Sequence, residues 1–184
     1  MLKKIGLAVV ALLVVLAVVV ATRPSHYRIV RSASIKAPAP AVYAQLVDFH
    51  RWEAWSPWEK LDPGMQKVFS GPDGLAGASY AWKGNDKVGE GRMTLTDARP
   101  EAVAIRLEFL KPMASVSVTT FLLAPEAAAT QVTWTMEGDN DFIGKAFCMV
   151  MDMDKMVGGD FERGLASLKT VAEQQTAAVP AVAR

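Results

Sequence analysis

The chain of 184 residues is long enough for one domain with a hydrophobic core and too short for two domains of ordinary size. Its 20 lysine and arginine residues nearly balance 19 aspartate and glutamate residues, and this balance gives no sign of the basic surface typical of nucleic-acid-binding proteins. Cys148 is the only cysteine, which excludes an internal disulfide, and two histidines without a cysteine pair nearly exclude a structural zinc site.

The first 23 residues have the composition of a membrane segment. Two lysines, Lys3 and Lys4, precede an uncharged apolar run from Ile5 to Ala21. As a helix this run is roughly 25 Å long, near the short limit for spanning a bilayer core. The lysines favour an amino terminus in the cytoplasm, so we expect a single-pass anchor in the inner (cytoplasmic) membrane with the following domain on the outer, periplasmic side.

A cleaved signal peptide is the alternative for the same segment, because Val19-Val20-Ala21 offers a small residue suited to a cleavage site. The domain would then be secreted. The apolar run is longer than the usual signal-peptide core, which favours the anchor. A buried soluble helix is disfavoured because the run is apolar on every face.

The domain begins with alternating residues from His26 to Ile35, which predict a strand. Pro38 and Pro40 then suit the first turn of a short helix, where a missing amide hydrogen does no harm. Its buried side is expected to consist of Val42, Leu46 and Phe49.

The segment Asp48–Trp58 holds three of the five tryptophans. A helical turn before Pro57 would bring Trp52 and Trp55 to one side. Such a cluster caps the end of a core or forms the wall of a hydrophobic pocket, and the two roles are compatible.

From Met65 onward, alternating segments separated by turn residues predict about six antiparallel strands in a meander. The clearest is Val103–Phe109, in which every second residue is apolar. In Ser115–Leu123 the apolar phase slips between Val118 and Phe121, which predicts a β-bulge.

Asp141 to Glu173 carries an apolar stripe at helical spacing and is predicted to form one long helix that the sheet covers. Cys148 lies within it and is expected to be a small buried hydrophobe. Gly158 and Gly159 mark either a kink or a place where the backbone comes close to the sheet or to a ligand. The last residues, 176–184, lack periodicity and are expected to be a disordered tail.

Several short motifs resemble one known superfamily. They are Ile35-Lys36-Ala37-Pro38, Trp52-x-x-Trp55-Ser56-Pro57-Trp58, Thr130-x-Val132-x-Trp134 and Met153 to Gly158 with Gly164 to Lys169. Together with the order of elements they are similar to the SRPBCC (START-like) superfamily, and within it to the bacterial polyketide cyclase/dehydrase-like branch. The resemblance covers roughly Ser25 to Glu173. It implies a helix-grip fold with an internal pocket for a hydrophobic molecule, and it does not by itself settle function.

An enzyme in such a pocket would need a positioned acid or base, and the weak candidates are Asp48, His50 and Glu53, beside the tryptophans. Asp152 and Asp154 lie too far apart on a helix to share a cation and are interpreted as solvated, with Asp152 near Lys155. No nucleophile elbow or phosphate-binding loop is present in the sequence.

The sequence thus predicts an α+β helix-grip domain at 24–175 behind a membrane segment at 1–23. We expect it to bind a hydrophobic small molecule or lipid between the curved antiparallel sheet and the carboxy-terminal helix, with no cofactor, metal or nucleic acid. The alternatives are a cyclase/dehydrase-like enzyme using the same pocket and a fully packed interaction domain. The expected ligand-binding residues are Trp52, Trp55, Tyr80, Trp82, Met93, Leu107, Phe109, Trp134, Met136, Phe147 and Met151.

Overall fold

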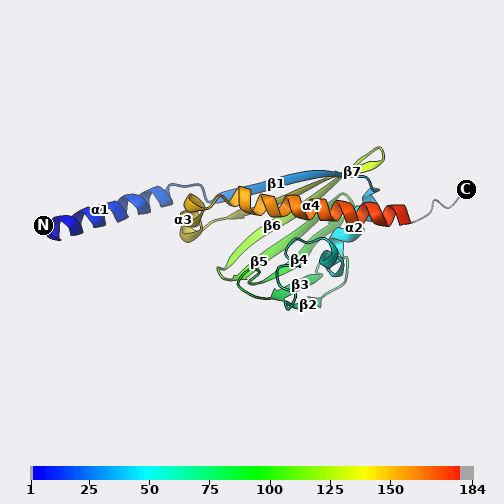
Figure 1. The fold of residues 1–184 in the computed structure, drawn as a ribbon, viewed down its shortest axis with the longest axis horizontal. Coiled ribbons are helices and arrows are strands. Elements are labelled where there is room, and N and C mark those ends of the chain that lie inside the picture. Colours follow the sequence, from blue (N-terminus) through cyan, green and yellow to red (C-terminus); the bar gives the residue numbers. More distant parts are fainter. Residues whose placement is uncertain (1, 179–184) are drawn as a thin grey trace, which may run out of the picture.

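A computed structural model describes residues 2–178 of the protein. The elements are α1 (Leu2–Ala21), β1 (His26–Ile35), α2 (Ala39–Val47), the 3-10 helix η1 (Phe49–Ala54), β2 (Gln66–Ser70), β3 (Ser79–Lys83), β4 (Glu90–Arg99), β5 (Ala102–Lys111), β6 (Ser115–Glu126), β7 (Ala129–Asp139), α3 (Phe142–Val150) and α4 (Met153–Ala178). Figure 1 shows α1 projecting from one end of the molecule and α4 running along the sheet.

The seven strands form one antiparallel sheet in the order β1-β7-β6-β5-β4-β3-β2. Strands β2 to β7 follow one another as a meander, and β1 closes the far edge by pairing with β7 along its whole length. The predicted first strand, His26–Ile35, and the predicted meander are therefore confirmed.

One face of the sheet carries the core, because side chains alternate between faces along each strand. The fully buried residues on this inner face include Ile29, Ile105, Phe121 and Trp134. The short helix α2 adds Val42 and Leu46, and η1 adds Phe49, as the sequence predicts.

The predicted single helix from Asp141 to Glu173 is wrong in one respect, because the chain forms two helices. Met151 is extended, with φ −115° and ψ 127°, and it ends α3. Asp152 then accepts a hydrogen bond from the backbone N–H of Lys155 and so satisfies an orphan donor at the start of α4. The apolar stripe crosses this break, and for that reason the periodicity alone did not reveal it.

Helix α4 packs chiefly against β1 and α2, which makes the fold a helix grip. Phe161, Leu165, Leu168 and Ala172 form its buried side. A Cβ at Gly164 would lie 2.8 Å from the ring of Trp134, so this glycine allows the helix to approach the sheet closely.

The predicted bulge in β6 is also wrong. β6 pairs with both β5 and β7 without a register shift, and the irregular register lies between β4 and β5. The apolar pattern of β6 slips in the sequence because the first three inner-face residues, Ser115, Ser117 and Thr119, are polar, while Val118 faces outward and is exposed. Ser117 is tolerated there because its hydroxyl lies 2.9 Å from the hydroxyl of Tyr27, within hydrogen-bonding distance.

The two ends of the chain extend beyond this core. α1 is exposed along its length apart from Val19 and Val20 at its end, and it is long and apolar enough to cross a membrane, a property that a signal sequence shares. Helix α4 continues to Ala178, so the first residues of the predicted tail, Thr176 to Ala178, are helical. The rest of that tail lies outside the described residues.

Candidate functional site

Three of the expected pocket residues are core tryptophans. Trp52 and Trp55 are fully buried with ring centroids 4.6 Å apart, so the turn of η1 brings them to one side as predicted. Their indole N–H groups donate to the backbone carbonyls of Leu46 and Gln45. Trp134 stacks on Phe161 at 4.0 Å, and its indole N–H is the one buried side-chain polar atom of the described residues without a hydrogen-bond partner.

These rings fill the space between the sheet and α4 around Phe161 and Gly164. Two hollows of residues 2–178 lie elsewhere, on the surface, one beside Pro38 to Pro40 and one between the β3–β4 turn and Lys111. Neither of these hollows is lined by Trp52, Trp55 or Trp134. The inner face that is left for an apolar ligand lies on the other side of Phe161, toward the first turns of α4.

At that end of the sheet the inner face is less well covered. Its half-buried apolar side chains are Tyr27, Trp82, Leu107, Phe109 and Val157, which we call the open face. Met93 and Met136 are buried next to them and form its floor. Of the eleven expected ligand-binding residues, the structure gathers Trp82, Met93, Leu107, Phe109 and Met136 here.

Two aromatic rings of the open face lie across glycines of neighbouring strands. A Cβ at Gly91 would come within 2.4 Å of the ring of Trp82, and one at Gly138 within 2.7 Å of the hydroxyl of Tyr27. Trp82 also meets Phe109 edge to face, with centroids 5.8 Å apart. The glycines allow the rings to lie against the sheet, so the open face is a shallow apolar surface.

A polar cluster borders the open face. The hydroxyl of Tyr80 donates to Oε1 of Glu59 at 2.8 Å, and the ammonium of Lys67 is paired with the other oxygen of that carboxylate. The side chain of Glu59 is only 6% exposed. Burial, reinforced by the hydrogen bond to Glu59, raises the pKa of Tyr80 well above its usual range.

Glu59 and Lys67 are absent from the sequence-based candidates. Glu59 lies in an irregular loop after Trp58, and Lys67 lies on a short strand whose alternation is weak. Lys67 and Phe69 lie on the same face of β2. Only the pairing of β2 with β3 shows that this face is directed toward Tyr80.

The weak catalytic candidates lie on the outside of η1. Asp48 caps this helix: its carboxylate accepts from the backbone N–H of His50 and from Nε of Arg51. The imidazole of His50 is exposed and stacks on Phe69, with centroids 4.0 Å apart. Glu53 is exposed, and its carboxylate lies 3.9 Å from the ammonium of Lys67 in the polar cluster.

Phe147 and Met151 lie apart from the other expected pocket residues. Both are exposed, Phe147 on α3 and Met151 at its end, and α3 packs against α1 instead of covering the sheet. Cys148, expected to be buried, is half-buried on the same helix, with its sulfur 3.5 Å from the amide nitrogen of Asn140.

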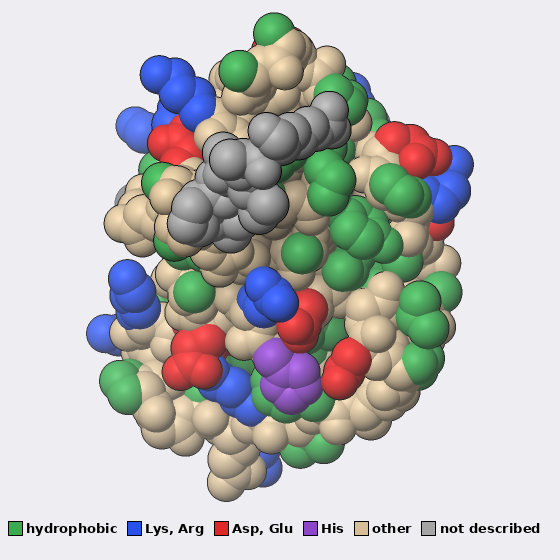
Figure 2. Space-filling model, turned by 90° about the vertical axis from the view of Figure 1, so that its right-hand side faces the viewer, with side chains coloured by type: hydrophobic (Ala, Val, Ile, Leu, Met, Phe, Trp, Pro, Cys, Tyr) green, Lys and Arg blue, Asp and Glu red, His purple; other side chains and the backbone are tan. Residues whose placement is uncertain are grey.

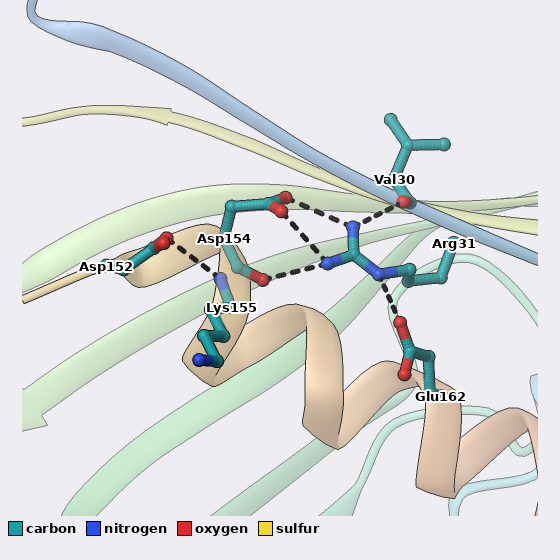
Figure 3. A network of polar contacts seen from close by, with 6 residues as sticks. All are labelled: Val30, Arg31, Asp152, Asp154, Lys155 and Glu162. Carbon is teal, nitrogen blue, oxygen red and sulfur yellow. Dashed lines mark hydrogen bonds and ion pairs between the residues drawn. The ribbon is translucent and has the colours of Figure 1, made fainter.

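Asp154 is exposed, as expected, and it also binds Arg31, a contact that the sequence did not indicate. Figure 3 shows the guanidinium between β1 and α4, where it donates to both carboxylate oxygens and the carbonyl of Asp154, to Glu162 and to the carbonyl of Val30. All five N–H donors are thereby used. A Cβ at Gly158 would lie 2.0 Å from this group, so close packing against β1 explains that glycine.

Surface charge gives no second candidate site on the end of the molecule where α4 ends. Basic and acidic side chains are interspersed across that face, without a single dominant patch (Figure 2). This distribution agrees with the net charge of +1.

Comparisons with solved structures support the fold. The di-domain aromatase/cyclase StfQ from the steffimycin biosynthetic pathway aligns with a TM-score of 0.61 and 11% identity over 84% of this chain and 53% of its own. The Aha1 dimer from Colwellia psychrerythraea aligns at 0.58 and 20% identity, over 80% of this chain and 96% of its own. Ginseng major latex-like protein 151 from Panax ginseng aligns at 0.54 and 12% identity, over 82% and 97% of the two chains.

Sequence comparison identifies the family. No curated protein matches the chain at a significant level. The sequence profile of the polyketide cyclase/dehydrase and lipid transport family matches residues 26–173, which is nearly the whole domain. The chain therefore belongs to the polyketide cyclase/dehydrase and lipid transport family, within the SRPBCC superfamily.

Proposed function

We propose that this protein binds an apolar small molecule or lipid on the open face and that α1 holds it at a membrane. The observation that carries the proposal is the half-buried apolar surface formed by Tyr27, Trp82, Leu107, Phe109 and Val157 beside a well-packed core. Covering apolar surface stabilises a complex by about 25 cal/mol per Å². A ligand laid on this surface would gain that contribution.

The family supports this kind of ligand, since its description includes lipid transport. The site is narrower than the sequence predicts, because Trp52, Trp55 and Trp134 are engaged in the core. The neighbouring Glu59, Lys67 and Tyr80 supply a polar border at which the head of an amphiphilic ligand would be oriented.

The membrane part of the proposal concerns α1. Its 20 residues correspond to about 30 Å of helix, which matches the thickness of a bilayer core. Lys3 and Lys4 favour an orientation with the domain on the periplasmic side of the inner membrane. Release by signal cleavage is the alternative, and the amino-terminal sequence of the purified protein distinguishes the two.

Native mass spectrometry of the full chain, released from mild detergent, tests the binding. The wild type should carry an apolar adduct or take up a fluorescent fatty acid. Leu107→Arg, which places a charge on the open face, should abolish uptake. The matched control is Leu122→Arg on the outer face of β6, where the side chain is exposed and uptake should persist. A clean apo mass without uptake, or equal uptake by both variants, would favour a packed interaction domain.

A cyclase or dehydrase activity is the second candidate function, and the buried carboxylate of Glu59 next to the phenol of Tyr80 favours it. Such chemistry would use these groups as acid and base toward a ligand on the open face. Glu59→Gln should then remove turnover of a polyketide-like substrate while leaving its binding intact. Binding without turnover by the wild type would assign the protein to transport or storage.

A further inference from the structure

Helix α3 presents apolar side chains to solvent, the reverse of what a helix on a soluble domain does. Ile143, Phe147 and Val150 recur at i, i+4 and i+7 and so form one stripe, and their side chains are 63%, 40% and 84% exposed. No residue of α3 is fully buried. A contiguous exposed apolar patch of this kind indicates a surface that is covered by a membrane, a ligand or another protein.

The position of α3 next to α1 indicates that a lipid bilayer covers this apolar stripe. Val20, near the end of α1, is 3% exposed, and α1 packs against α3. The ammonium of Lys145 lies 3.5 Å from the carbonyl of Ala21, and the N–H of Asn140 donates to the carbonyl of Ser25 at 2.9 Å. The segment that leads into β1 and the segment that follows β7 are thus hydrogen-bonded to each other next to the last turn of α1 (Figure 1).

This junction fixes the depth of α3. If α1 fills the hydrocarbon core, its last residues lie at the boundary with the headgroups. An amphipathic helix at that level buries its apolar face about 5–10 Å into the boundary between headgroups and acyl chains. Exposed Leu110 and Met113 flank the β5–β6 turn at the same end of the sheet, and Lys145 carries a charge that can extend to the headgroups.

We propose that the exposed stripe of α3 lies in the interface of the bilayer that α1 crosses, so that the domain is seated on phospholipid at this end. The inference rests on the anchoring by α1 proposed above. The open face is at this end too, because Tyr27, Trp82 and Phe109 lie near the strand ends adjacent to α3. An apolar ligand would then pass between bilayer and site without crossing bulk water.

Bimane fluorescence of the full chain in phosphatidylcholine/phosphatidylglycerol vesicles tests this seating. Cys148→Ser provides a background without the native thiol, and single labels are placed at Ile143→Cys, Leu75→Cys and Leu13→Cys. Leu75 is the matched control: it is 60% exposed, and it lies in the β2–β3 turn at the opposite end of the sheet. The label at 143 should show blue-shifted emission and loss of iodide quenching, as the label at 13 does, whereas the label at 75 should stay quenched.

The outcomes separate the two proposals. A quenched label at 143 with a protected label at 13 would overturn the seating of α3 and leave the anchor intact. Quenched labels at both positions would overturn the anchor and the seating together. Protection at 143 that persists in monodisperse detergent-free protein would show that α3 is covered by a second copy or by its own domain, and would overturn the lipid assignment. Adding Val150→Glu should restore quenching at 143 if lipid covers the stripe.

Discussion

The indole ring of Trp134 on β7 lies parallel to the phenyl ring of Phe161 on α4, with centroids 4.0 Å apart and planes inclined by 7°. Gly164, one helical turn farther along α4, allows this approach, since a Cβ there would lie 2.8 Å from the same indole. The pair joins the sheet to the helix at the centre of the core. Packing at this point therefore decides how firmly the helix is gripped.

Phe161→Ala should lower the free energy of unfolding by about 3–5 kcal/mol, because it removes a buried ring and leaves a cavity against Trp134. Urea titration of the full chain in detergent, followed by tryptophan fluorescence and circular dichroism, measures the change. Phe142→Ala is the control, since Phe142 is exposed on α3 and its removal should shift stability by less than about 0.5 kcal/mol. Equal midpoints for the two variants would contradict the role of the pair.

Gly158→Ala and Gly159→Ala should have different effects on stability although the two glycines are neighbours. A Cβ at Gly158 would lie 2.0 Å from the guanidinium of Arg31, whereas one at Gly159 would meet only Arg163, at 3.6 Å. Alanine is favoured over glycine in a helix by about 1 kcal/mol, so Gly159→Ala should be neutral or stabilising. Gly158→Ala should destabilise by more than this gain, because Arg31 must leave its partners. Thermal unfolding of both variants would show the difference, and parallel shifts would refute it.

Because of Asp154, the free energy of unfolding should depend on pH in the acidic range. Its hydrogen bond with Arg31, and then the charge of that group, lower the pKa of Asp154 in the folded state. The ionised carboxylate of Asp154 contributes to the free energy of unfolding above its unfolded-state pKa of about 3.9. This contribution is lost as the pH falls through the lower folded-state pKa. Asp154→Asn should therefore be less stable than wild type at neutral pH and should converge with it in acid. Asp86→Asn, in the exposed β3–β4 turn, should run parallel to wild type throughout.

Tyr80 should make stability depend on pH at the alkaline end. Burial, and next the hydrogen bond to Glu59, raise its pKa in the folded state. Its contribution is present below the unfolded pKa of about 10 and is lost as pH rises above it, since only the unfolded chain then releases the proton. Denaturation series between neutral and alkaline pH should show a smaller decrease of the free energy of unfolding for Tyr80→Phe than for the wild type. Glu59→Gln should flatten it partly, and an unchanged slope in both variants would exclude Tyr80 as the cause.

The sheet could be predicted from the sequence because each strand carries its own pattern. The alternation in Val103–Phe109 and the turn at Gly71–Gly74 are local signals, and a meander needs only neighbouring strands to pair. The strand His26–Ile35 has the same bounds in the structure. Patterns of this kind do not depend on distant parts of the chain.

The candidate site was predicted less well, because it depends on which buried residues remain half-covered. Trp134 and Leu107 both alternate as inward residues of strands, yet Trp134 is fully buried against Phe161 and Leu107 is only half-buried. The polar cluster joins Glu59 of a loop to Lys67 and Tyr80 of two strands. No spacing in the sequence indicates that pairing.

By itself the sequence determined the long apolar helix at the amino end, the antiparallel sheet, the burial of Val42 and Leu46 and the family, because composition and periodicity are properties of contiguous residues. Only the tertiary structure decided that the carboxy-terminal stripe is divided between two helices, with α4 against the sheet and α3 beside α1. An apolar stripe specifies that a helix face is to be covered, and its spacing carries no information about what covers it. That choice depends on contacts such as Arg31 with Asp154, which form between residues far apart in the chain.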